Sequence, residues 1–387
     1  MHGLAPHVHR PGVRPSPAVP WSRPGADGHT SPRCGPRLIN HRQIRSDTTA
    51  TTPRHAGTWT SSAFLVKQGE KYRLVVSYVK VNNKTIKYKQ PIPRIASLFD
   101  RFSIAVYFAH LDMVRAYHHV EIDEKDKHKT GFIVPFGIFE FNRLPFGLCN
   151  APAFFNRIIY NIFCDLDFVL VYIDDIIIFS NTLQDHIEHI KIVFTRIKQN
   201  NLKLNKDKCK FAQDSIKLLG FVITKNGLQT DPDKIKCIKE RKPPTKMKEL
   251  QQFLGLTNYY RQFIRDYAKI AAPLYTLLSP NVPYCWTDMC QNAFNELKNA
   301  LISEPILKMV DFNKPFILYT DASILAIGTI LSQPDDNGKE HPIYYASRLL
   351  KPAERNYSIT ELECLAVVWS VLYFHIYLFG KRFTIIT

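Results

Sequence analysis

The chain has 387 residues, of which 45% are hydrophobic and 25 are phenylalanine, so it can bury two or three domain cores. Its 51 Lys and Arg residues outnumber its 34 Asp and Glu residues, and the formal charge of +17 favours a polyanionic partner, either nucleic acid or an anionic membrane surface. The longest uncharged apolar stretch, residues 364–380, is shorter than a membrane span of about 20 residues and indicates a buried helix instead. No apolar run follows the basic residues at the N-terminus, so we expect no secretory signal there. We therefore expect no membrane association and an intracellular protein, in a cytoplasmic particle or the nucleus.

Residues 1–60 contain nine prolines and eight arginines but no lysine, and they lack apolar periodicity. This composition predicts a disordered segment, and the alternative is a basic arm that binds RNA. The eight cysteines of the chain include no Cys-x-x-Cys pair, so we expect reduced core thiols rather than a zinc site.

Residues 61–230 have a globular pattern that predicts an α+β region with a small antiparallel sheet. The expected strands cover residues 63–66, 72–79, 107–112, 132–136, 139–144, two strands within 168–180, and a hairpin from 216 to 228. The expected helices cover residues 151–163 and 186–199.

Residues 231–304 predict helices, because apolar residues such as Leu250, Phe253 and Leu254 recur at helical spacing. Residues 305–387 predict a separate α/β unit. Its strands are expected at 316–320, 326–332 and 343–346, and its helix from residue 360 to about residue 378.

Three aspartates are candidates for a catalytic metal site. Asp174 and Asp175 follow the apolar strand that ends at Tyr172, and consecutive acids can serve one site only where the backbone turns. Asp112 ends the strand that starts at Tyr107 and can lie beside that turn. Phosphoryl transfer by two Mg²⁺ ions needs such clustered oxygen ligands. The alternative is a plain hairpin, since Asp is a common turn residue.

From about residue 61 to the last residue, the chain resembles the Pol polyprotein of gypsy-type LTR retrotransposons, with retroviral reverse transcriptases as more distant relatives. The motifs that carry the resemblance are Leu111-Asp-Met-Val-Arg-Ala-Tyr-His-His119, Leu144-Pro-Phe-Gly-Leu-Cys-Asn-Ala-Pro-Ala153, Tyr172-Ile-Asp-Asp175, Leu218-Leu-Gly-Phe221, Phe253-Leu-Gly-Leu-Thr-Asn-Tyr-Tyr-Arg-Gln-Phe263, Tyr319-Thr-Asp-Ala-Ser323 and Tyr345-Ala-Ser-Arg348. The resemblance implies an α+β fold, a right-hand polymerase with palm, fingers and thumb followed by a partial α/β ribonuclease H-like domain. Fingers and palm would occupy residues 61–230, a helical thumb or connection 231–304, and the ribonuclease H-like domain, truncated at its C-terminus, 305–387.

The implied activity is RNA-directed DNA polymerisation, in which Asp112, Asp174 and Asp175 bind two Mg²⁺ ions, with Mn²⁺ as a possible substitute. The implied partners are an RNA template, a DNA primer, an RNA–DNA hybrid and deoxynucleoside triphosphates. The oligomeric state stays open. One alternative is a catalytically impaired transposon remnant that binds nucleic acid, favoured by departures from the family in the fingers. Another, an RNA-templated RNA polymerase, is disfavoured by Tyr117 and by the attached ribonuclease H-like unit.

Four residues match the nucleotide-binding positions of the family. Tyr117 would lie beneath the incoming sugar and exclude a 2′-hydroxyl, and its alternative is a core tyrosine. Arg73 and Lys67 would contact the triphosphate, although Lys67 is equally explained as a surface charge. Phe146 falls at the nucleotide-pocket position.

Two further groups match positions of the family that contact nucleic acid. Leu219, Gly220 and Phe221 resemble the hairpin that holds the primer. Gln251, Gly255 and Tyr259, spaced four apart, share one helix face that resembles the thumb surface in the duplex minor groove. The alternative is that Gly255 permits helix packing.

A second metal site is implied by Asp321 and Glu363. Glu361 and Glu363 are two residues apart on one helix, so their side chains diverge by about 200° and only one can face Asp321. The family context favours Glu363. The chain ends where the family places its next acid, so two of four carboxylates are missing and we expect no ribonuclease H activity.

Overall fold

The computed structural model describes residues 51–54, 59–69, 71–89, 98–303 and 306–387. These residues divide into two compact units, one within residues 1–92, 111–176 and 193–209, and the other within residues 93–110, 177–192 and 210–387. Helices and strands are mixed in both, which confirms the predicted α+β class. Among the described residues, no helix is both long enough and apolar enough to cross a membrane. Most of the segment 1–60 lies outside the described residues.

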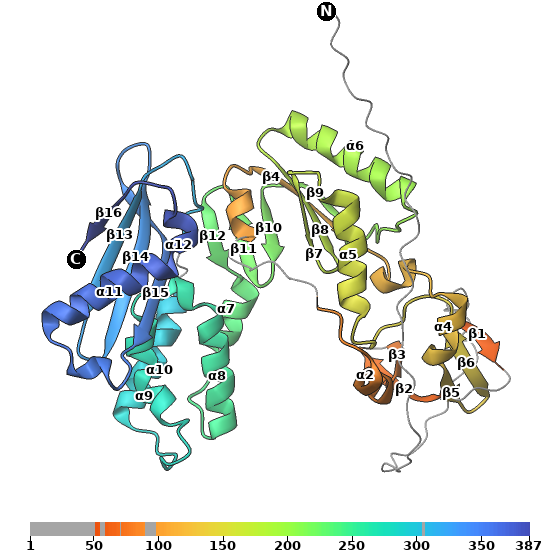
Figure 1. The fold of residues 1–387 in the computed structure, drawn as a ribbon, viewed down its shortest axis with the longest axis horizontal. Helices are drawn as coiled ribbons and strands as arrows, with labels where there is room; N and C mark the ends of the chain where they lie inside the picture. The colour runs from red at the N-terminus through yellow and green to blue at the C-terminus, as the bar shows by residue number, and fades with distance from the viewer. Residues whose placement is uncertain (1–50, 55–58, 70, 90–97, 304–305) are drawn as a thin grey trace, which may run out of the picture. The chain divides into compact units, whose positions relative to one another are not determined.

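A five-stranded sheet in the first unit has the order β1-β6-β5-β2-β3 (Figure 1). Its strands are β1 (Thr51–Arg54), β2 (Ser61–Gln68), β3 (Lys71–Val76), β5 (Phe132–Val134) and β6 (Gly137–Phe141). Two predictions are wrong here. Residues 51–54, expected to be disordered, form a strand antiparallel to β6. Residues 77–79, expected to extend β3, instead lead into helix α2 (Val79–Lys84), where the hydroxyl of Tyr78 donates a hydrogen bond to the Thr130 carbonyl at 2.9 Å.

A second sheet has the order β7-β8-β4-β9. Its strands are β4 (Tyr107–Asp112), β7 (Val169–Tyr172), β8 (Asp175–Ser180) and β9 (Lys210–Gln213). Helix α5 (Ala151–Phe163) has the predicted bounds, and α6 (Leu183–Gln199) begins three residues before the predicted start. Short helical segments complete this part of the chain: η1 (Asp100–Phe102), η2 (Ala116–His119), α4 (Glu124–Lys127) and η3 (His128–Thr130). The central strand β8 is buried from Ile176 to Ser180, which explains its continuous apolar run.

In the second unit, residues 215–230 form an antiparallel three-stranded meander. Its strands are β10 (Ser215–Leu218), β11 (Phe221–Thr224) and β12 (Gly227–Thr230). Helical segments follow as predicted: α7 (Pro232–Lys239), α8 (Met247–Tyr259), η4 (Arg261–Phe263), α9 (Tyr267–Thr276) and α10 (Asp288–Ile302). Helix α8 buries the apolar stripe of Leu250, Phe253 and Leu254, as its spacing predicts.

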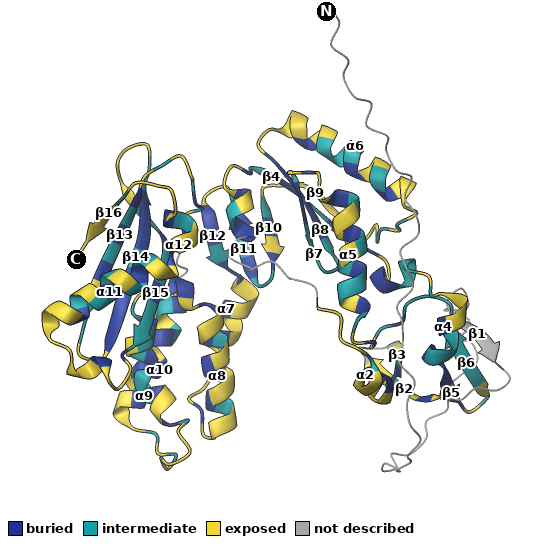
Figure 2. Cartoon of the chain, viewed as in Figure 1, coloured by how far each residue is buried: buried dark blue, intermediate teal, exposed yellow. Residues whose placement is uncertain are grey.

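A four-stranded sheet of order β15-β14-β13-β16 ends the chain. Its elements are β13 (Phe316–Ala322), β14 (Ala326–Pro334), β15 (Glu340–Leu349), η5 (Glu354–Asn356), α11 (Ile359–Tyr373), α12 (His375–Leu378) and β16 (Phe383–Ile386). Strand β16 runs parallel to β13, whereas the other pairs are antiparallel. Helix α11 packs on β13 and β14, and α9 packs on β15 (Figure 1). Strand β14 is buried along most of its length, whereas β13 alternates between buried and half-buried residues up to Thr320 (Figure 2).

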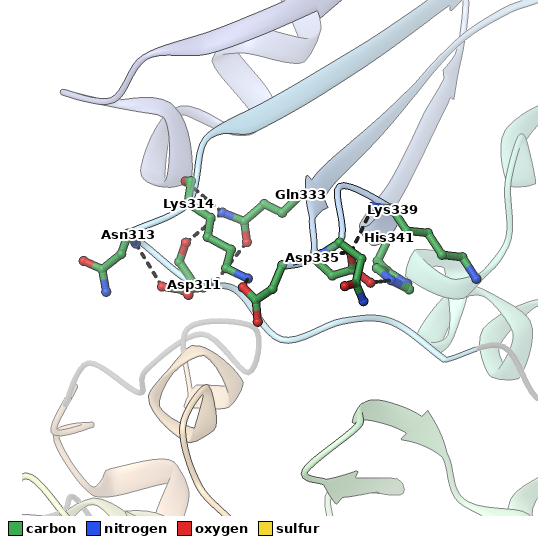
Figure 3. Close-up of polar contacts among 9 residues, drawn as sticks. Asp311, Asn313, Lys314, Gln333, Asp335, Lys339 and His341 are labelled. Atoms are coloured by element: carbon green, nitrogen blue, oxygen red, sulfur yellow. Dashed lines mark hydrogen bonds and ion pairs between the residues drawn. The ribbon is translucent and has the colours of Figure 1, made fainter.

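A polar cluster closes one end of this sheet (Figure 3). Gln333 is buried, and its Nε2 donates to the carbonyl oxygens of Asp311 at 2.7 Å and Lys314 at 3.1 Å. Its Oε1 accepts a hydrogen bond from the backbone N–H of Asp311 at 3.0 Å. In the following turn, Asp335 lies 3.0 Å from Nε2 of His341. These bonds satisfy a buried amide and join the segment before β13 to the end of β14.

The C-terminal helices differ from the prediction of a buried helix over residues 364–380. One side of α11 and α12 buries Leu362, Ala366 and Leu378, but the other exposes Val368, Leu372 and Ile376. Both helices accordingly have buried and exposed stretches (Figure 2). The prediction of core thiols is also wrong for most cysteines. Among the described cysteines only Cys290 is buried, and all seven are free.

Candidate active site

The three predicted aspartates lie on one edge of the β7-β8-β4-β9 sheet. The backbone N–H of Val106, just before β4, bonds to the carbonyl of Ser180 at the end of β8 at 2.9 Å. The adjacent strands β4 and β8 therefore run antiparallel, which brings Asp112 at the end of β4 toward Asp175 at the start of β8. Asp174 lies in the turn between β7 and β8.

The backbone of this turn is strained. Ile173 has a φ of +54°, a left-handed conformation that a β-branched residue rarely adopts. Such strain costs about 1–3 kcal/mol and occurs preferentially at functional sites. The turn thereby places two successive carboxylates at one edge, which a regular strand would send to opposite faces.

The electrostatics of the site favour a cation. Burial raises the pKa of Asp174, and the charges of Asp175 and Asp112 raise it further. Oδ1 of Asp174 is buried without a hydrogen-bond partner. This orphaned oxygen could coordinate a divalent ion, and the charge of the ion would offset the repulsion among the carboxylates. These residues therefore fit the Mg²⁺ that the family implies.

The three carboxylates do not yet form a metal-binding cluster. Within the described ranges, no three His, Cys, Asp or Glu side chains are gathered tightly enough to hold a metal ion as they stand. Oδ2 of Asp112 instead lies 3.5 Å from Nζ of Lys208. The loop that carries Lys208 is held in place by the backbone N–H of Asn205, which donates to the Asp112 carbonyl at 2.8 Å. The sequence carries no signal for Lys208, since it is 96 residues from Asp112.

Three of the four predicted nucleotide-binding residues lie together. The ring centres of Tyr117 and Phe146 are 4.8 Å apart, and the guanidinium carbon of Arg73 lies 4.7 Å from the centre of the Phe146 ring. Burial raises the pKa of Tyr117, and the negative charge of Asp174 raises it further. Tyr117 is also buried against Phe155, so it has the packing role of a core tyrosine as well.

Lys67 does not join this group. In the β2–β3 hairpin Lys67 is paired with Tyr72, and Arg73 is paired with Val66. Side chains alternate between faces along a strand, so Lys67 and Arg73 project from opposite faces of the hairpin. Its assignment to the triphosphate stays a prediction, and its exposure agrees with the alternative of a surface charge.

Leu219 and Gly220 form the turn between β10 and β11, and Phe221 is buried at the start of β11. On α8, Gln251, Gly255 and Tyr259 are all exposed, as the prediction of a shared outer face requires. In the described part of the chain, a Cβ added at Gly255 would meet no atom of another element within 4 Å, so no packing contact there requires a glycine.

The second predicted metal site has Asp321 on β13 and Glu363 on α11, and these two elements pack together. Glu361 is committed elsewhere. It forms a capping box with Ser358, whose backbone N–H donates to Glu361 Oε2 at 2.7 Å. Glu363 Oε2 is buried without a hydrogen-bond partner, so Glu363 is the acid that fits a metal-binding role. Asp321 is exposed.

Two families match separate parts of the chain. Residues 65–223 match the family described as reverse transcriptase (RNA-dependent DNA polymerase). Residues 286–385 match the RNase H-like domain found in reverse transcriptase. The three aspartates and the nucleotide-binding candidates fall in the first match, and Asp321 and Glu363 fall in the second.

Similar proteins include retrovirus-related Pol polyproteins of Drosophila melanogaster. The chain is 41% identical to that of transposon 297 over 352 residues, which are 90% of this chain and 32% of the relative. It is 39% identical to that of transposon gypsy over 324 residues, which are 80% of this chain and 31% of the relative. The chain thus spans about a third of the length of these curated relatives.

Solved structures share the fold. A foamy viral protease-reverse transcriptase solved with double-stranded DNA superimposes with a TM-score of 0.80 at 23% identity, over 92% of this chain and 77% of that chain. A second such structure, of the dRH form with double-stranded DNA, gives a TM-score of 0.81 at 21% identity, over 92% of this chain and 65% of that chain. The chain belongs to the Pol polyproteins of gypsy-type LTR retrotransposons, as a region with a reverse transcriptase domain followed by an RNase H-like domain.

Proposed function

We propose that this chain is an RNA-directed DNA polymerase that adds deoxynucleotides to a DNA primer on an RNA or DNA template. The observation that carries the proposal is the strained turn at Ile173, which puts Asp174 and Asp175 at the sheet edge toward which β4 directs Asp112. The net charge of +17 supports a nucleic-acid partner. Foamy viral protease-reverse transcriptases of similar fold have been solved in complex with double-stranded DNA and with an RNA/DNA hybrid.

Asp112, Asp174 and Asp175 would hold two Mg²⁺ ions, or Mn²⁺ in their place. When bound, such ions supply charge neutralisation at the transferred phosphoryl group and lower the pKa of the attacking hydroxyl. The strained turn at Ile173 would keep two of the carboxylates at the edge of the sheet before the ions bind.

Arg73, Phe146 and Tyr117 would form the nucleotide pocket. The Arg73 guanidinium can bond to phosphate oxygens in its own plane, and the Phe146 ring beneath it fixes the orientation of that plane. Tyr117, wedged between Phe146 and Phe155, presents a rigid ring next to Asp174, where a ribose 2′-hydroxyl would collide with it.

Asp321 and Glu363 would hold metal in the RNase H-like domain. Their elements pack together, and the orphaned Glu363 oxygen lacks a partner. These two carboxylates by themselves are a small ligand set for two-metal hydrolysis, so we expect no specific cleavage of a hybrid by this chain.

Primer extension tests the proposed function. The chain is incubated with a DNA primer on an RNA template, deoxynucleotides and Mg²⁺ or Mn²⁺, beside the Asp174→Asn variant. We expect extension by the parent chain and a loss of at least about a thousandfold in the variant, because a metal-binding oxygen is removed. If the chain binds the duplex but shows no extension that is lost in Asp174→Asn, the proposal is contradicted. That result would favour an impaired remnant that only binds nucleic acid.

A further inference from the structure

The turn between β10 and β11 is held by two adjacent tyrosines of the helical region. The hydroxyl of Tyr259 donates a hydrogen bond to the Leu219 carbonyl at 2.6 Å. The hydroxyl of Tyr260 donates one to the Gly220 carbonyl at 2.8 Å. Two successive backbone carbonyls of the turn are thus bonded by side chains about 40 residues away in sequence.

The backbone of the turn depends on external support. Leu219 has a φ of +52° and Gly220 a φ of +75°. A leucine adopts this left-handed conformation only where its surroundings hold it. Glycine is required next to it, because a Cβ at Gly220 would lie 2.9 Å from the Tyr260 hydroxyl oxygen. The close approach of the Tyr260 phenol therefore depends on the backbone conformation of the turn and on the absence of a side chain at Gly220.

The two phenol rings are fixed by aromatic packing around Phe221. The Phe221 ring centre lies 5.3 Å from those of both Tyr259 and Tyr260, stacked on the first and edge-on to the second. Phe99 and Phe263 pack against the same ring at 5.1 and 5.9 Å. Rings packed in this way have few alternative rotamers, so the hydroxyl groups are directed at the turn before any ligand binds.

A backbone bond supports one side of the turn. The N–H of Asp231, which caps α7, also donates to the Gly220 carbonyl at 3.1 Å. The carbonyl of Gly220 therefore keeps one partner if the Tyr260 hydroxyl is removed. Leu219 has the larger conformational demand, so loss of the Tyr259 hydroxyl should affect the turn more.

Tyr259 also lies on an exposed surface. Its side chain is 43% exposed, on the helix face that carries Gln251 and Gly255. A duplex that rests on this face would touch the same phenol that holds the Leu219 carbonyl. The position of the turn and the position of the helix face are thus coupled through one side chain.

We propose that Tyr259 and Tyr260 are positioning residues whose hydroxyl groups hold the Leu219–Gly220 turn in place against the primer strand. The proposal rests on the proposed polymerase function. The two hydroxyls act through the turn backbone, so they determine the alignment of the primer terminus.

The test uses the full chain with Tyr259→Phe, Tyr260→Phe and both together. Tyr284→Phe is the matched control, because the Tyr284 hydroxyl donates a comparable bond to the Pro244 carbonyl at 2.9 Å elsewhere in the same unit. In hydrogen exchange, we expect the amides of residues 219–222 to exchange about tenfold faster in the double variant than in the parent or the control. In single-nucleotide incorporation, we expect kcat of the double variant to fall about tenfold. In Tyr260→Phe, which alters only a buried hydroxyl, we expect the dissociation constant for the duplex to change by less than about twofold.

The two measurements separate the proposals. Unchanged exchange at residues 219–222 in the double variant would overturn the inference whatever the activity. Faster exchange with kcat equal to that of Tyr284→Phe would overturn the role in primer alignment. Absence of extension by the parent chain would contradict the proposed function, while the exchange measurement would still report whether the hydroxyls hold the turn.

Discussion

The ammonium group of Lys208 lies 3.5 Å from Oδ2 of Asp112, next to the place where a metal ion would bind. The lysine side chain is 63% exposed and the aspartate side chain 27% exposed, so the pair is partly solvated. A partly solvated pair of this kind is weak, about 0.2–1 kcal/mol. It can balance the charge of Asp112 without preventing the ion from displacing the lysine.

Lys208→Gln should therefore strengthen metal binding. Removing the competing cation is expected to raise the affinity of the nucleic-acid-free protein for Mn²⁺ by about two- to fivefold, the factor that corresponds to a partly exposed ion pair. Titration calorimetry measures this affinity directly. Lys206→Gln removes the same charge from the same loop but keeps the contact between Lys208 and Asp112. Equal affinities of the two variants would show that this contact has no specific effect.

Arg73→Lys should impair nucleotide binding. Lysine keeps the charge but loses the planar group that lies 4.7 Å from the Phe146 ring, so the KM for deoxynucleotides is expected to rise about tenfold with a smaller change in kcat. Steady-state primer extension gives both constants. Arg101→Lys is the matched control, because the Arg101 guanidinium lies 5.7 Å from the ring of Phe179, outside the proposed pocket. A similar KM in the two variants would refute the role of Arg73.

Tyr117→Ala should relax the choice between deoxyribonucleotides and ribonucleotides. Without the ring, a 2′-hydroxyl meets no obstacle, and relative ribonucleotide incorporation is expected to increase at least about tenfold. Tyr117→Phe keeps the ring and should keep the selectivity. Competition between the two nucleotide types in primer extension measures the ratio. Equal ratios for the two variants would mean that Tyr117 has only a packing role.

Asp100→Asn should stabilise the protein above pH 6. Burial raises the pKa of Asp100 to about 6 from its ordinary value of 3.8, and a hydrogen bond with Tyr377 opposes the increase. The folded state thus favours the protonated acid. The stability that the folded state gains from the protonated Asp100 is fully present below pH 3.8 and is lost as the pH rises through about 6. The free energy of unfolding of the variant should exceed that of the parent by up to roughly 3 kcal/mol at pH 7.5 and by little at pH 4. Thermal unfolding at both pH values tests this, and a difference independent of pH would contradict it.

Glu361→Ala should weaken the start of α11 without affecting a metal site. The Glu361 carboxylate accepts hydrogen bonds from the backbone N–H and the hydroxyl of Ser358, so its loss is expected to cost about 1 kcal/mol of unfolding free energy. Thermal unfolding measures the cost. Glu363→Gln is the counterpart on the same helix, and it should reduce Mn²⁺ binding to this domain while leaving the cap intact. A loss of metal binding in Glu361→Ala would reverse the two assignments.

Local patterns predicted the elements that carry the site. The apolar runs around Asp112 and Asp174 identified β4, β7 and β8, because a buried strand needs a continuous apolar sequence whatever its neighbours are. Helix α5 was predicted with its observed bounds from Pro152 near its start. The strand at residues 51–54 was missed, because its pairing with β6 comes from a segment more than 80 residues away.

The sequence by itself supplied the candidates for chemistry: the three aspartates, Arg73, Phe146 and Tyr117 were predicted from motifs that are local in the chain and that resemble those of the family. Only the tertiary structure decided which of them meet. It joined Arg73 to Tyr117 through Phe146, placed Lys67 on the opposite face of its hairpin, and brought Lys208 to Asp112. It also showed Tyr259 and Tyr260 bonded to the turn at Leu219 and Gly220. Motifs record short-range backbone preferences, whereas contacts between side chains far apart in sequence depend on the register of strands and the packing of helices.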